Sequence, residues 1–90
     1  MNPEATSKRK LKIYPNPANR DMEVEYEAAD TGTADMKIIN MLGLTVLSKQ
    51  VPIKKGLNSS PVNVAALVPG TYVVILANGF MQQKGIFVKY

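Results

Sequence analysis

Carboxylates are the side chains in this sequence best placed to do chemistry, because it contains no cysteine and no histidine. Thiolate nucleophiles, imidazole bases and the usual zinc sites are therefore excluded. Glu23 and Glu25 would lie on one face of a strand, the arrangement of a catalytic carboxylate pair. They alternate with Met22, Val24 and Tyr26, which a strand with one solvated face explains better. We expect no catalysis there.

Two further polar segments are weak candidates for a site. The segment from Asp30 to Asp35 has two carboxylates and two threonines, but it lacks the dense ligand spacing of a calcium loop. Asn58-Ser59-Ser60 fits the N-glycosylation triplet, which is common by chance. We predict an ordinary turn at the first segment and no cofactor.

The formal charge of +4 suggests a nucleic-acid binder until the charges are located. The basic cluster near the start consists of Lys8, Arg9, Lys10 and Lys12. From Ile13 onward the sequence has seven basic and six acidic residues, so the net charge of this part is 7 − 6 = +1. A basic run of this kind is typical of a solvated linker, so we predict no nucleic-acid partner.

The chain is long enough for one domain. Residues 1–10 are polar and aperiodic, and we interpret them as a linker or an added tail before a domain over residues 11–90. No apolar stretch is long enough to cross a bilayer, and no signal peptide is visible. An exported protein would need its signal peptide upstream of this chain.

Short apolar segments separated by turn residues predict seven strands. The clearest covers 21–27, where apolar and acidic residues alternate strictly. The others are expected over 11–14, 36–41, 44–51, 62–64, 71–77 and 80–89, with a loop over 52–58. This number of short strands, with no amphipathic helix, predicts an all-β fold, a seven-stranded immunoglobulin-like antiparallel β-sandwich.

Glycine and proline define the boundaries of these strands. Two prolines in Pro15-Asn16-Pro17 must end the first strand, since they remove two backbone donors. Asn78-Gly79 predicts a type I′ hairpin turn between the last two strands. Gly85 marks a β-bulge in the final strand.

Several segments together resemble the type A C-terminal sorting domain of the type IX secretion system of Bacteroidetes. They are Tyr14-Pro15-Asn16-Pro17-Ala18, then Ile38-Ile39-Asn40-Met41-Leu42-Gly43, then Leu67-Val68-Pro69-Gly70-Thr71-Tyr72-Val73-Val74, and finally Lys84 and Lys89 around an apolar strand. No single motif is specific, but their order and spacing cover residues 11–90.

The resemblance implies a secretion signal rather than an enzyme. Such domains follow a larger cargo protein, which passes through the periplasm on its way to the cell surface or medium. The implied partners are the N-terminally fused cargo, an outer-membrane translocon, and a sortase-like peptidase that removes the domain. Cleavage near the front of the domain implies that residues 1–10 contain or adjoin the cut.

Nine residues match the family's motifs and are the candidate recognition residues: Pro15, Asn16, Pro17, Gly43, Pro69, Gly70, Tyr72, Lys84 and Lys89. The prolines, glycines and Tyr72 also have purely structural explanations as strand ends, turns and core. We expect Lys84 and Lys89 to point outward from the terminal strand and to serve recognition. Unpaired edge groups on that strand would allow strand addition to a translocon subunit or a second copy; the oligomeric state stays open.

The alternative function is an immunoglobulin-like adhesion module that binds carbohydrate or protein. A sugar-binding face requires exposed aromatic side chains, and the candidates are Tyr14, Phe80 and Tyr90.

Overall fold

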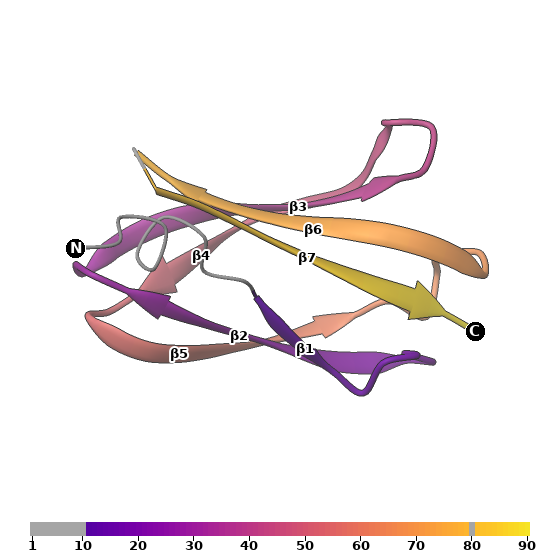
Figure 1. The fold of residues 1–90 in the computed structure, drawn as a ribbon, viewed down its shortest axis with the longest axis horizontal. Coiled ribbons are helices and arrows are strands. Elements are labelled where there is room, and N and C mark those ends of the chain that lie inside the picture. The colour runs from indigo at the N-terminus through magenta and orange to yellow at the C-terminus, as the bar shows by residue number, and fades with distance from the viewer. Residues whose placement is uncertain (1–10, 80) are drawn as a thin grey trace, which may run out of the picture.

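The computed structural model describes residues 11–79 and 81–90, which form two antiparallel sheets packed face to face (Figure 1). The first sheet has the order β1-β2-β5, from β1 (Lys12–Tyr14), β2 (Asp21–Ala28) and β5 (Gly56–Asn63). The second has the order β4-β3-β6-β7, from β3 (Gly32–Asn40), β4 (Thr45–Ile53), β6 (Gly70–Asn78) and β7 (Met81–Lys89). The predicted seven-stranded β-sandwich is confirmed. The predicted linker, residues 1–10, lies outside the described residues.

The core follows from period-two alternation along each strand. Met22, Val24 and Tyr26 of β2 are buried between the sheets, while the glutamates between them face outward. The largest completely buried side chains are Phe87, Met22, Met36, Ile38, Leu76, Val24, Val64 and Val74. Each contributes about 1.5–3 kcal/mol by leaving water. Among the described residues, no helix is long and apolar enough to span a bilayer.

Strand β5 corrects the prediction of a loop over 52–58 followed by a short strand over 62–64. It pairs with β2 along its whole length, from Gly56 opposite Ala28 to Asn63 opposite Asp21. The sequence of β5 lacks the alternation of apolar and polar residues that predicts a strand, because some of its inward-pointing side chains are polar. Ser60 is buried, and its hydroxyl lies 3.0 Å from that of Tyr26.

The turn before β5 is held by Asn58, which also points inward and is 8% exposed. Its side-chain oxygen accepts from the Lys54 amide, and its amide nitrogen donates to the Lys54 and Gly56 carbonyls. A side chain engaged in this way is not presented for glycosylation, so the triplet that begins at Asn58 has a structural explanation.

Other strand boundaries differ by a few residues. β3 begins at Gly32 rather than Met36, and β4 continues to Ile53 through Pro52. Proline is tolerated there because β4 is an edge strand, paired only with β3. Asn78 pairs with Met81 as the last rung between β6 and β7, so it belongs to the ladder rather than to the centre of the turn.

The predicted bulge at Gly85 is wrong, since β7 pairs with β6 without a register shift, and the irregularity lies between Ile38 and Ile39. Gly85 instead permits a close crossing of the N-terminal segment over β7. A Cβ atom there would lie 3.0 Å from Leu11 Cβ and 3.0 Å from Ile13 Cδ1. Such distances are shorter than ordinary van der Waals contact, so a side chain at this position would push Leu11 and Ile13 away by a few tenths of an ångström.

We predict that Gly85→Ala destabilises the domain by about 1–3 kcal/mol, the usual cost of overpacking a close contact. Urea unfolding followed by tyrosine fluorescence measures the effect. Gly32→Ala is the matched control, because nothing lies within 4 Å of a Cβ at Gly32. Equal unfolding midpoints for the two variants would contradict the proposed crossing.

Candidate recognition site

The motif residues gather at one end of the sandwich, except for Lys84. Figure 1 shows the loop after β1, the β3–β4 turn, the β5–β6 connection and the end of β7 at the same end. Pairing links them directly: Gly70 lies opposite Lys89, Asn40 opposite Tyr72, and Ala18 bridges to Lys89. We call this the motif end. Its segments are distant in sequence, and only the topology brings them together.

The segment from Tyr14 to Ala18 closes the outer edge of β7. Asn16 donates from Nδ2 to the Ile86 carbonyl at 3.2 Å and accepts from the Val88 amide through Oδ1 at 2.9 Å. Its carboxamide therefore takes the place of a peptide group from a neighbouring strand. Both X-Pro bonds of the segment, after Tyr14 and after Asn16, are cis.

Backbone bonds complete this closure on both sides of Asn16. Leu11 N donates to Lys84 O at 3.1 Å, Ala18 N donates to Val88 O at 2.7 Å, and Tyr90 N donates to Ala18 O at 2.9 Å. The expectation of an open β7 edge is therefore wrong over this stretch. Strand addition there would first have to displace the N-terminal segment.

Gly43 serves the β3–β4 turn. Its φ is +85°, a left-handed conformation that glycine adopts without strain. Asn40 stabilises the same turn, because its Oδ1 accepts from the amides of Leu42 and Leu44 at 2.9 and 3.0 Å. This role of Asn40 was not predicted from sequence, although an Asn three residues before a turn glycine is a local signal for it.

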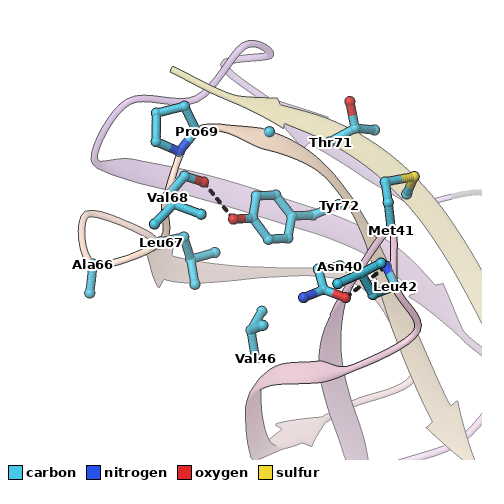
Figure 2. Close-up of a pocket in the computed structure, with 11 residues that line it drawn as sticks. Asn40, Met41, Leu42, Val46, Ala66, Leu67, Val68, Pro69, Thr71 and Tyr72 are labelled. Atoms are coloured by element: carbon cyan, nitrogen blue, oxygen red, sulfur yellow. Dashed lines mark hydrogen bonds between the residues drawn. The ribbon is translucent and has the colours of Figure 1, made fainter.

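Tyr72 anchors the segment that begins at Pro69. The side chain is 3% exposed and stacks on Phe87, with ring centroids 5.4 Å apart. Its hydroxyl donates to the Val68 carbonyl (Figure 2). Tyr72 thus ties the β5–β6 connection to the core, which is a structural role.

A shallow groove of about 430 Å³ lies between these two turns. Figure 2 shows side chains of the β3–β4 turn facing those of the β5–β6 connection across it. Its lining residues are Asn40, Met41, Leu42, Val46, Ala66, Leu67, Val68, Pro69, Gly70, Thr71 and Tyr72. None of them carries a formal charge, and the tyrosine hydroxyl is already engaged. The groove is suited to apolar contact and offers no acid, base or metal ligand.

Lys84 and Lys89 differ in exposure, which corrects the expectation that both point outward. Lys84 is exposed on the outer face of the sheet, whereas Lys89 is 6% exposed. Five positions separate them, so regular alternation puts them on opposite faces of β7. The Lys89 ammonium group donates to the Tyr90 carbonyl oxygen at 2.9 Å. Lys89 packs within the fold, and of the two only Lys84 is presented to a partner.

The polar candidates on the opposite sheet are engaged with neutral side chains. Ser59 donates to Glu23 at 2.7 Å, and Tyr14 donates to Glu25 at 2.8 Å. This hydrogen bond to Glu25, together with nearby negative charge, raises the pKa of the Tyr14 phenol. Among the described residues, no group of three or more His, Cys, Asp or Glu side chains is placed to hold a metal ion.

The aromatic candidates of the adhesion alternative are only partly placed. Tyr14 and Tyr90 are 43% and 70% exposed. Phe80 lies outside the described residues.

Two comparisons with known proteins bear on these observations. A family model described as "Secretion system C-terminal sorting domain" matches residues 12–89. No curated protein matched the chain. The matched range runs from the first residue of β1 to the last residue of β7 and so includes every strand of the sandwich.

We predict that Asn16→Ala accelerates hydrogen exchange at the Val88 amide and lowers stability by roughly 1–2 kcal/mol, because two hydrogen bonds to the β7 edge are lost. NMR-detected exchange and urea unfolding measure the two effects. Gln50→Ala on the exposed edge strand β4 is the control, since its side chain makes no hydrogen bond within the part of the chain that the structure describes. An unchanged Val88 exchange rate would show that Asn16 does not close the edge.

Proposed function

The chain belongs to the family of secretion system C-terminal sorting domains, and we propose that it carries an N-terminally fused cargo through the periplasm and across the outer membrane. The type IX machinery is its partner, and the cargo is a secreted or cell-surface protein. The family match over residues 12–89 is the observation that carries this proposal. It favours sorting over the adhesion alternative.

The motif end supports a role as a label rather than as an enzyme. Its conspicuous polar groups are engaged in hydrogen bonds that shape the backbone, as in Asn16, Asn40 and Tyr72. The groove between its turns is lined by neutral residues. These features suit a rigid shape for another protein to bind, and we assign no reaction to the domain itself.

The motif residues divide into two classes in this proposal. Most of them build the recognised shape: Pro15, Asn16, Pro17, Gly43, Pro69, Gly70, Tyr72 and Lys89. Lys84 alone projects a free charge from the last strand. We therefore propose that Lys84 contacts the translocon directly and that the others act by holding the fold.

Removal of the domain after export is the second part of the proposal. A sortase-like peptidase would cut within or next to residues 1–10, just before the first strand. A peptidase requires an extended segment outside the folded body, and what supports this site is the polar, aperiodic sequence of residues 1–10.

We predict that residues 11–90, fused behind a periplasmic reporter, deliver the reporter to the cell surface or medium in a host with the type IX system. In an isogenic strain without the translocon, the reporter should stay in the periplasm. Reporter without the domain is the control in both strains. Retention of the fusion in the competent host would refute the proposal. Deleting 84–90 is a poor alternative test, because it removes Phe87 from the core.

We predict a second outcome for a fusion that contains residues 1–90. Mass spectrometry of the exported reporter should show a new C-terminus within or next to residues 1–10, and a host without the peptidase should keep the fusion intact. An exported fusion that retains the whole domain in the complete host would refute cleavage while leaving the export role standing.

A further inference from the structure

The outer face of the four-stranded sheet is apolar at its centre, whereas an antiparallel sheet with one side in water is usually polar on that side. The register places Ile39 beside Val73 and Val73 beside Ile86, in one row across β3, β6 and β7 (Figure 1). On the same face, Ile75 lies on one side of this row, at the rung of Lys84, and Val88 lies on the other side, at the rung of Thr71. We call these five side chains the apolar face. Ile86 and Val88 are 62% and 36% exposed.

Strand propensity does not account for this composition. Thr is branched and favours strands too, so an exposed strand position does not require Ile or Val. The other sheet shows the polar alternative in the same molecule, since Glu23, Glu25 and Glu27 project outward from β2. Ile39, Val73 and Ile75 are half-buried beside the two exposed side chains. A contiguous apolar patch of a few hundred Å², the size of the largest one on a typical monomer, is often functional, unlike the single apolar side chains that most surfaces carry.

Two lysines lie at one end of the apolar face, on either side of Ile75. Lys37 and Lys84 are exposed, and both lie directly opposite Ile75, one on each neighbouring strand. Strand spacing puts their Cα atoms roughly 10 Å apart. Among the described residues, neither ammonium group has an ion pair or hydrogen-bond partner. Asp35, one pleat away on β3, is the only carboxylate that the four strands place on this face.

The charge pattern excludes some occupants of this face. A second copy docked with its two-fold axis at the lysine pair would bring its own Lys37 and Lys84 against this pair, and like charges repel. Anionic membranes are bound by clusters of about four to eight basic residues, and this face has two, next to Asp35. A glycan platform requires aromatic rings, and the described strands place none on this face.

We propose that the apolar face docks onto a protein of the export machinery, on a patch that is apolar at its centre and carries carboxylates about 10 Å apart for Lys37 and Lys84. This inference rests on the proposed sorting function and identifies the surface through which the export machinery would recognise the domain. The face covers roughly 300 Å², well below the ~800 Å² per partner of a stable complex. We therefore expect a transient contact. A sorting signal requires this, because the machinery must release it after export.

The test uses the reporter fusion with two changes to this surface, Lys37→Glu/Lys84→Glu and Ile86→Thr. Both change only exposed side chains and leave the core untouched, so urea unfolding midpoints should lie close to that of the unchanged domain. The matched controls are Lys54→Glu/Lys55→Glu, with the same change of charge in the β4–β5 turn, and Leu57→Thr, at a 69% exposed residue of the other sheet. Lys37→Arg/Lys84→Arg tests whether charge alone suffices.

We expect each surface variant to lower the exported fraction at least about tenfold, the scale of losing one contact of an interface, while the controls and the arginine pair export normally. A photocrosslinking residue in place of Ile86 should form a crosslink to a translocon subunit, at a position next to acidic residues of that subunit. Normal export of both folded surface variants would overturn the inference, as would crosslinking only to a second copy. The inference would also be overturned if the unchanged domain sedimented with phosphatidylserine vesicles and the Lys37→Glu/Lys84→Glu variant did not, because the face would then bind a membrane. Failure of the unchanged domain to export would instead refute the sorting function.

Discussion

The closure of the outer edge of β7 is the interaction on which the rest of the fold depends. A terminal edge strand presents unpaired amides and carbonyls that other chains can bind. Here the first described segment satisfies them, through the backbones of Leu11 and Ala18 and the carboxamide of Asn16. The two ends of the domain are thereby joined, and Gly85 leaves the space that this crossing needs.

This closure gives the Pro15-Asn16-Pro17 segment a structural role within the domain. Asn16 offers one donor and one acceptor at the spacing of a peptide group, and the flanking prolines have no amide of their own to satisfy. Asn40 with Gly43, and Tyr72 with Val68, hold the remaining turns at the same end of the sandwich. Shape is the property that these residues determine.

The two outer faces of the sandwich have different chemistry. The β1-β2-β5 face carries carboxylates paired with hydroxyl and amide side chains. The β4-β3-β6-β7 face carries branched apolar side chains, with two lysines beside Ile75 that have no ion-pair partner among the described residues. The polar face suits exposure to water, whereas the apolar one leaves branched side chains in contact with water. In our docking proposal, the first face stays in solvent and the second contacts the partner.

Local pattern determined much of the fold. The alternation of acidic and apolar residues over 21–27 specifies a strand with one buried face, and two prolines end the strand before it, because both effects act between near neighbours in the chain. The odd separation of Lys84 and Lys89 already implies opposite faces in a regular strand. Which of the two lies inside is not contained in that spacing.

Only the tertiary structure decided the features that depend on distant partners. β5 is a full strand although its inward side chains at Asn58 and Ser60 are polar, because the turn backbone and Tyr26 satisfy them. Gly85 is a crossing point rather than a bulge because Leu11 passes over it. Hydrogen bonds and close contacts between segments some seventy residues apart leave no periodic trace in sequence, since each half has an ordinary local environment until the chain folds.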